Sequence, residues 1–394
     1  MASISDIVIS NIDSISSSYA QNITEPTRVM QDLSDELRKE GTFIKTFERI
    51  APITDRSLVA IDGGNAKEQL SGGDLIVAGA TLGEGLSSKK LYSSPEEYPS
   101  EVYNSVIPHT SNNEKIEKSI RSALELRILQ QVPADLKIID GAYLGNVSSV
   151  LYALIDHDPV VSNSILELNF FDSDGLLFEA MQTILYPPRS NESYIIGVAK
   201  SDSAKKYSND LLKDRNIQLH VTDRMLASRM LRPGEFFAPR QEQSNPGLVA
   251  ALTKQIGMPD FAKGSSNKTL LMKMVQDKAG LLNRMGKADR TEEGILWTTY
   301  FKPTAWSEYA KAVKVDFVFY HGDSSQTPEE RAREIVQIVD QDIIDESVLE
   351  PWCQYAADRG AKGVSDAINI VKNHLLSTVE NPAELRGLLR GYRT

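Results

Sequence analysis

The chain has 394 residues, of which 41% are hydrophobic and 25% are charged, as in ordinary soluble globular proteins. This length allows a large core and one or two domains. No apolar run approaches the about 18 to 20 residues that a membrane helix needs, and the start lacks the basic region and apolar core of a secretory signal. We therefore expect a cytoplasmic protein that makes no membrane contact. The single cysteine, Cys353, excludes an intrachain disulfide and a thiolate-rich zinc site.

The net charge of −11 argues against a protein that coats nucleic acid through bulk electrostatic attraction. It does not exclude a nuclease, because enzymes that cut phosphodiesters use clustered carboxylates to hold divalent metals.

Residues 1 to 50 show apolar side chains at helical spacing and predict a helical segment that packs against the main sheet or a partner. The segment from Arg56 to Gly85 then reads as two neighbouring strands joined by a glycine-rich turn. Asp62 directly follows the first apolar run, so we place it at the end of a buried strand. A buried carboxylate must be neutral, paired or bound to a metal. The alternative is an Asp-Gly turn that faces water.

After a predicted strand at Lys90 to Ser93 and an irregular connection, Glu114 to Gln131 has the composition of a helix. Glu125 lies within its apolar face, unless it reaches out to the rim of that face. The run from Ala134 to Tyr143 repeats the arrangement of a strand followed by Asp-Gly at Asp140. Two parallel strands of this kind would bring Asp62 and Asp140 to one sheet edge, and the helix between them would lean Glu125 toward both.

Further along, an apolar strand from Tyr194 to Val198 precedes Lys200, which either meets a phosphate or lies on the surface. Asp223 reads as an N-cap. Strands are predicted at residues 295 to 301 and 313 to 320, a helix at 329 to 339, and an exposed acidic connection at 340 to 350. One amphipathic helix follows Pro351 and carries Asp358 in its first turn, where the helix dipole alone would favour an acid. Residues 241 to 290 are polar and read as helical, without an evident role.

Taken in order, six motifs make the chain resemble the NurA family of DNA-end-processing nucleases over roughly residues 55 to 375. These motifs are VAIDGG, ELRIL, IIDGAY, IIGVAK, VTDRMLASRMLRPGE and EPWCQYAADRGAK. The resemblance implies an RNase H-like α/β fold, a mixed sheet flanked by helices, over residues 51 to 394, with the N-terminal segment and the 241 to 290 insertion added. It also implies a homodimer that works with a HerA-like hexameric ATPase.

As site residues, the resemblance implies metal binding by Asp62, Glu125 and Asp140. The chain departs from archaeal members, which have a tyrosine and a histidine where this sequence has Glu350 and Asp358. Asp358 can still act as a fourth ligand. The first motif reads Asp-Gly-Gly where the family usually has Asp-Gly-Ser.

Carboxylates suit Mn²⁺ or Mg²⁺, and the five histidines lack the spacing of a zinc site. In a two-metal reading, Asp62, Glu125, Asp140 and Asp358 hold the metals and Lys200 contacts a phosphate. We therefore predict a metal-dependent deoxyribonuclease, acting as exonuclease and single-strand endonuclease in DNA repair or antiviral defence. The alternatives are a catalytically inactive adaptor of the ATPase and an enzyme that acts on RNA.

Overall fold

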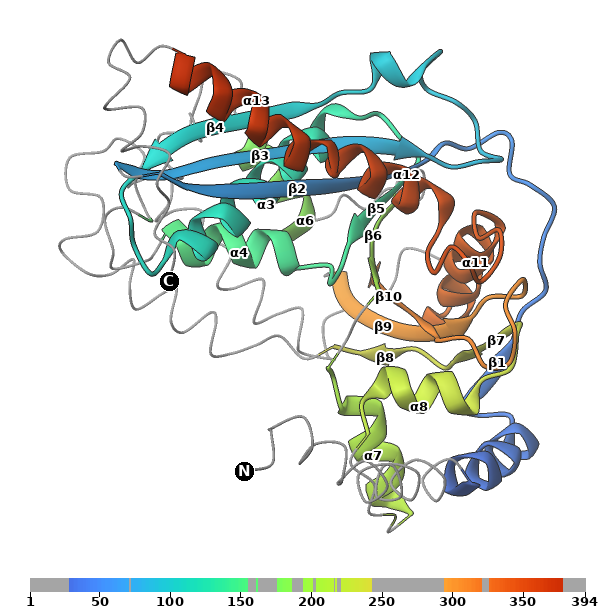
Figure 1. Cartoon of the computed structure of the whole chain (residues 1–394). Helices are drawn as coiled ribbons and strands as arrows, with labels where there is room; N and C mark the ends of the chain where they lie inside the picture. Colours follow the sequence, from blue (N-terminus) through green and yellow to red (C-terminus); the bar gives the residue numbers. More distant parts are fainter. Residues whose placement is uncertain are drawn as a thin grey trace, which may run out of the picture.

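The backbone is organised around one ten-stranded mixed sheet (Figure 1). The structure is a computed structural model, and it describes residues 28–70, 72–154, 161, 176–185, 194–200, 203–215, 217, 221–242, 294–320 and 326–377. The strands run in the order β1-β7-β9-β10-β6-β5-β2-β3-β4, with β8 paired to β9. Their bounds are β1 Ile44–Thr46, β2 Leu58–Leu70, β3 Gly73–Glu84, β4 Glu101–Ile107, β5 Leu136–Asp140, β6 Tyr194–Ala199, β7 Glu235–Phe237, β8 Arg240–Gln241, β9 Gly294–Lys302 and β10 Val313–Tyr320.

The centre of the sheet is parallel and both flanks are antiparallel. Strands β2, β5 and β6 lie side by side in parallel, whereas β3 and β4 on one flank, and β10, β9 and β7 on the other, are joined through antiparallel pairs. The predicted pairing of two parallel strands that each lead into Asp-Gly is confirmed. The predicted RNase H-like mixed sheet is confirmed as well.

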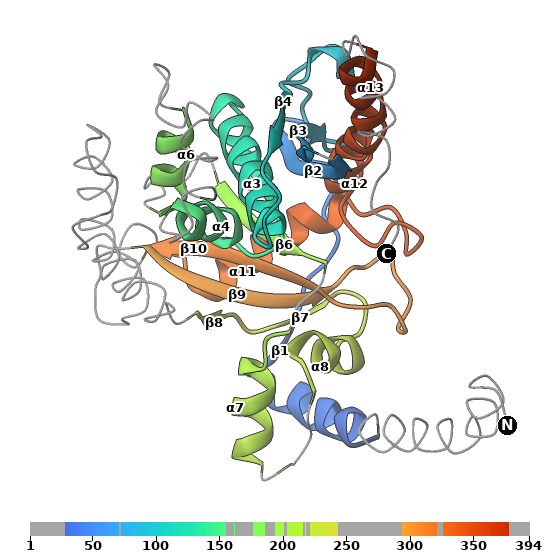
Figure 2. The ribbon, with the colours of Figure 1, turned by 60° about the vertical axis from the view of Figure 1, so that its left-hand side comes forward.

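Helices cover both faces of the sheet (Figure 2). Helices α3, α4 and α6 pack on one face of β2 and β3, and α12 and α13 pack on the other. Helix α11 covers β9 and β10 on the face that α12 shares. Within the described ranges, no helix is both long and apolar enough to cross a membrane. The helix bounds are α3 Asn113–Gln131, α4 Gly145–Leu154, α6 Leu176–Leu185, α7 Lys206–Asp214, α8 Asp223–Met230, α11 Pro328–Gln341, α12 Trp352–Ala361 and α13 Gly363–Ser377, with a short 3-10 helix at Pro95–Glu97.

A separate apolar cluster joins the N-terminal helical residues 28–40 to α7, α8 and the β7 edge of the sheet. The N-terminal segment also supplies β1, which pairs with β7 and lies at the end of the sheet. Residues 1–27 of the predicted helical segment lie outside the described residues. The same holds for the predicted 241 to 290 insertion, apart from its first two residues.

Three local predictions are wrong. Strand β2 continues past Asp62 to Leu70, which pairs with Gly73 at the start of β3, so Asp62 is within a strand. No strand forms at Lys90 to Ser93; the third strand of this sheet flank is β4, which begins at Glu101. The last helix is two helices, because the chain turns at Lys362 between α12 and α13.

Three acidic residues, Asp223, Asp340 and Asp342, also differ from the prediction. Thr222 is the N-cap of α8, and its side chain accepts a hydrogen bond from the Met225 amide. Asp223 is buried and accepts hydrogen bonds from the amides of Lys206 and Ser208 at the start of α7 instead. The 340 to 350 connection is not simply exposed, since Asp340 and Asp342 are buried and hold backbone amides.

Candidate active site

The end of the β2 and β5 pairing brings Asp62 and Asp140 together. The parallel register runs up to Ile61 opposite Ile139, so each aspartate is the next residue of its own strand. Side chains alternate between sheet faces along a strand. Because Ala60 lies in the core on the α11 and α12 face, Asp62, two residues on, faces the same way. The same alternation places Asp140 on that face.

Glu125 approaches from the opposite face of the sheet. It lies on α3, is buried, and accepts a hydrogen bond of 2.5 Å from the amide of Asn146 on α4. Arg121, one turn earlier on α3, places its Nε 3.3 Å from Glu125 Oε1. Gly63 makes room for this arrangement, since a Cβ there would lie 2.6 Å from Glu125 Oε1. The side chain of Glu125 therefore extends toward β2, as predicted.

Asp358 is brought to the site by the close approach of α12 to the hairpin. A Cβ on Gly83 would lie 2.1 Å from the Cys353 carbonyl oxygen, and one on Gly64 would lie 2.3 Å from the Ala361 carbonyl oxygen. These contacts need glycine because backbone atoms occupy the space of a side chain. They also explain why this chain reads Asp-Gly-Gly, since a serine at position 64 would push α12 away.

Lys200, at the end of β6, joins the group through two ion pairs. Its Nζ lies 3.3 Å from Asp140 Oδ2 and 2.7 Å from Glu350 Oε2. Glu350, which stands where the sequence resemblance led us to expect a tyrosine, is thus the counter-ion of Lys200.

Sequence reasoning missed four polar side chains that touch these carboxylates: Arg121, Asn146, Gln354 and Lys362. Gln354 donates hydrogen bonds to Asp140 Oδ1 and to the Val198 carbonyl oxygen. Its spacing from Asp358, four residues along the same helix, is the one signal that could have placed it on the same face.

Electrostatic coupling ties the carboxylates into one group. Burial, and then the charge of Asp140, raises the pKa of Asp62 to about 7. Burial also raises the pKa of Glu125 to about 8, with Asp62 adding to the rise while Arg121 opposes it. Burial works to lower the pKa of Lys200, but the charges of Asp140 and Glu350 raise it above its ordinary value. Ionising all of these buried carboxylates is therefore unfavourable, and a bound divalent cation would offset their negative charge.

The donor set suits a hard cation, because all four predicted ligands offer carboxylate oxygens. Within the part of the chain that the structure describes, no three acidic, histidine or cysteine side chains already form a metal-binding group. Instead, Arg121 pairs with Glu125, Lys200 with Asp140, and Lys362 with Asp358 at 2.6 Å. Three carboxylates thus carry a basic partner that a metal would have to replace.

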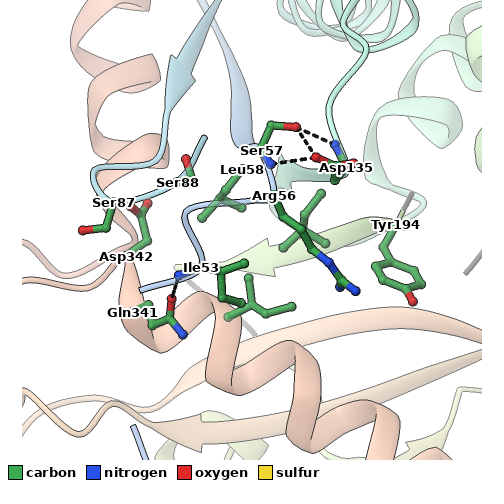
Figure 3. Close-up of a pocket in the computed structure, with 12 residues that line it drawn as sticks. Ile53, Arg56, Ser57, Leu58, Ser87, Ser88, Asp135, Tyr194, Gln341 and Asp342 are labelled. Carbon is green, nitrogen blue, oxygen red and sulfur yellow. Dashed lines mark hydrogen bonds between the residues drawn. The ribbon is translucent and has the colours of Figure 1, made fainter. Parts of the chain in front are cut away.

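A small hollow lies at the other ends of β2 and β5, away from the convergent carboxylates, and its lining differs from theirs (Figure 3). Its wall is mainly apolar, from Leu58 and Leu136 at the strand starts. The carboxylate of Asp135 in this hollow accepts hydrogen bonds from the amide and the hydroxyl of Ser57, at 2.7 and 2.6 Å. The convergent carboxylates are therefore at the other end of the strands.

The chain superposes on the crystal structure of the NurA nuclease from Sulfolobus solfataricus with a TM-score of 0.56 and 14% sequence identity, covering 96% of this chain and 99% of that chain. The chain has a NurA-like fold. A crystal structure of NurA bound to dAMP and manganese gives a TM-score of 0.51 and 11% identity, over 97% of this chain and 99% of that one. No protein-family model and no curated protein sequence matches the chain.

Proposed function

We propose that this NurA-like chain is a divalent-metal-dependent DNA nuclease. The observation that carries the proposal is the convergence of Asp62, Glu125 and Asp140 from strand, helix and strand, with mutual repulsion that raises the pKa of Asp62 and Glu125 after burial. Such a group is costly to a protein unless it holds cations. The manganese and dAMP bound by the similar NurA structure support the choice of metal and of nucleotide chemistry.

In this proposal the ligands of Mn²⁺ or Mg²⁺ are Asp62, Glu125, Asp140 and Asp358. Divalent ions held there would supply Lewis-acid chemistry, namely activation of a water and stabilisation of the leaving oxygen of a phosphodiester. The protein's own part is to hold the carboxylates on three rigid elements and to supply positive charge beside them. Lys200 meets a phosphate next to the scissile bond. Arg121 and Lys362, once separated from their carboxylates, add to that positive charge.

The decisive assay digests linear single-stranded and double-stranded DNA with Mn²⁺, with Mg²⁺ and with EDTA. Cleavage with either metal and none with EDTA is the expected result. Shortening from the ends and cutting within single strands would together match the proposed exonuclease and single-strand endonuclease. RNA of the same sequence serves as a further substrate, and preferential cleavage of RNA would reassign the enzyme to a ribonuclease.

A second candidate is an inactive adaptor of an ATPase, favoured by one observation. The carboxylates already carry basic partners in the ion pairs of Glu125, Asp140 and Asp358. An adaptor would show no cleavage with any metal and no change in melting temperature when Mn²⁺ is added. Binding of Mn²⁺ together with cleavage would exclude it.

We further propose a HerA-like hexameric ATPase as the partner, in DNA repair or antiviral defence within the cytoplasm. A net charge of −11 gives the chain little non-specific hold on DNA, and a translocase with its own DNA channel would deliver the substrate. Digestion rates with and without the ATPase test this. Equal rates and equal processivity would remove delivery as the reason for the pairing.

A homodimer is the proposed assembly. It is supported by the resemblance to a family whose members form dimers. A second support is that residues 1 to 50 and 241 to 290 are additions that an RNase H-like sheet does not need. Light scattering at micromolar concentration should give twice the mass of the chain, and a monomer would contradict the proposal.

A further inference from the structure

Gln354 is fully buried in α12 and makes two hydrogen bonds through one atom. Its Nε2 donates to Asp140 Oδ1 and, at 3.2 Å, to the Val198 carbonyl oxygen. A backbone carbonyl oxygen can only accept a hydrogen bond, and an ionised carboxylate can only accept as well. The amide must therefore present its nitrogen, and not its oxygen, to both partners. The side chain therefore has one orientation, set by Asp140 and β6.

The Val198 carbonyl oxygen also fixes the backbone beside Asp140. It accepts a hydrogen bond of 2.9 Å from the amide of Gly141. Gly141 has a φ of +100°, a conformation that favours glycine, and it turns the chain away directly after the aspartate. One carbonyl thus anchors both the main chain that follows Asp140 and the amide that holds its side chain.

The other atom of the amide, Gln354 Oε1, is buried and has no hydrogen-bond partner among the residues that the structure describes. Buried carbonyl oxygens without a donor are rare in folded proteins, and each one calls for an explanation such as a bound ion or water. This oxygen belongs to the same amide that grips Asp140. It therefore lies next to the carboxylates and not in a remote part of the core.

We infer that Gln354 is a positioning residue of the candidate metal site. Its Nε2 holds Asp140 Oδ1, so the oxygen that would bind the metal is Oδ2, for which Lys200 Nζ, 3.3 Å away, competes. The inference rests on the proposed metal-dependent function. Hydrogen bonds to metal-binding carboxylates fix their orientation, and losing one typically costs about 10 to 100-fold in metal affinity or activity.

The test is titration of Mn²⁺ into the metal-free full-length protein, without DNA, by calorimetry. Gln354→Met keeps the length and approximate volume of the side chain but removes both amide atoms, and it should weaken Mn²⁺ binding by about 10 to 100-fold. Gln341→Met is the matched control. Gln341 uses its amide oxygen to accept from the Ile53 amide at 2.9 Å, in the hollow at the far ends of the strands (Figure 3). This control should bind Mn²⁺ as the wild type does.

Two further measurements separate positioning from packing. Gln354→Asn keeps an amide but is one methylene shorter, so it too should lose Mn²⁺ affinity. In cleavage assays, Gln354→Met should need more Mn²⁺ for half-maximal rate while the rate at saturating Mn²⁺ recovers in large part. Melting temperatures of the metal-free variants report how much stability each substitution costs in the absence of metal.

Wild-type affinity for Mn²⁺ in both Gln354 variants would overturn the inference, as would equal losses in Gln354→Met and Gln341→Met. Asp140→Asn distinguishes this failure from failure of the proposed function. If the wild type binds Mn²⁺, Asp140→Asn does not, and Gln354→Met matches the wild type, then only the positioning role is wrong. If the wild type binds no Mn²⁺, the metal site itself is wrong and the inference falls with it.

Discussion

Gly63 lies against the carboxylate of Glu125, and this contact between β2 and α3 decides whether the glutamate can reach the aspartates. A Cβ built on Gly63 would lie 2.6 Å from Glu125 Oε1 and 2.5 Å from Arg121 Cγ. Both distances are shorter than side-chain carbons tolerate. The absence of a side chain at position 63 is therefore part of the site.

Gly63→Ala should displace Glu125 and reduce Mn²⁺-dependent cleavage at least about tenfold. Overpacking of this kind typically costs about 1 to 3 kcal/mol of stability, so the melting temperature should fall by several degrees. The control is Gly72→Ala in the turn of the same hairpin, where an added Cβ meets nothing within 4 Å. Cleavage rate and melting temperature of both variants check this. Normal cleavage by Gly63→Ala would mean that Glu125 is not needed in its present position.

Asp140→Asn should leave folding almost unchanged and lower cleavage by orders of magnitude. The substitution keeps size and shape but removes one charge from the metal ligands, whose stabilisation of the transition state is worth several kcal/mol at about 1.4 kcal/mol per factor of ten. DNA binding should persist, because fewer carboxylates repel the phosphates. Asp135→Asn, at the opposite end of β5, should show the reverse: lower stability and normal cleavage. Wild-type cleavage by Asp140→Asn would remove Asp140 from the site.

Lys200→Gln should change metal and DNA affinity in opposite directions. The lysine competes with a cation for Asp140 Oδ2 and also offers positive charge to a phosphate. Its loss should therefore tighten Mn²⁺ binding and weaken DNA binding, measured by calorimetry and by fluorescence anisotropy. Lys213→Gln, an exposed change on α7 with the same loss of charge, controls for net charge. Parallel changes in the two affinities would show that Lys200 does not sit between metal and substrate.

The metal-free protein should lose stability as the pH rises from about 4 to about 8. Asp62 and Glu125 have pKa values of about 7 and about 8 in the folded protein, against about 4 when unfolded. Between these values the folded chain binds more protons, so the contribution is complete below pH 4 and is lost as the pH rises through 7 and 8. In EDTA, the melting temperature should fall with rising pH more steeply for the wild type than for an Asp62→Asn, Glu125→Gln variant. Parallel curves would contradict the raised pKa values.

Added Mn²⁺ gives a second readout of the same charge. At pH 8 the carboxyl groups of Asp62 and Glu125 lose their protons, and bound Mn²⁺ would neutralise the resulting charge. Mn²⁺ should therefore raise the melting temperature of the wild type. The double variant should respond much less.

Local sequence pattern determined the centre of this protein. Short apolar runs ending in Asp-Gly predicted β2 and β5, and the helical periodicity of residues 114 to 131 placed Glu125 on a buried face. Those signals suffice because strand alternation and helix period are properties of neighbouring residues. They predicted that three carboxylates would converge. They did not predict that β2 runs on past Asp62, since only its pairing with β3 keeps a glycine-rich segment extended.

Only the tertiary structure decided what touches those carboxylates. Gln354 meets Asp140 across 214 positions of sequence, and Glu350 meets Lys200 across another long separation. Whether α12 comes close enough depends on bare glycine backbone at Gly64 on β2 and Gly83 on β3, which lie far from that helix in the sequence. Contacts of this kind depend on how whole elements pack, and no periodicity within either segment carries that information.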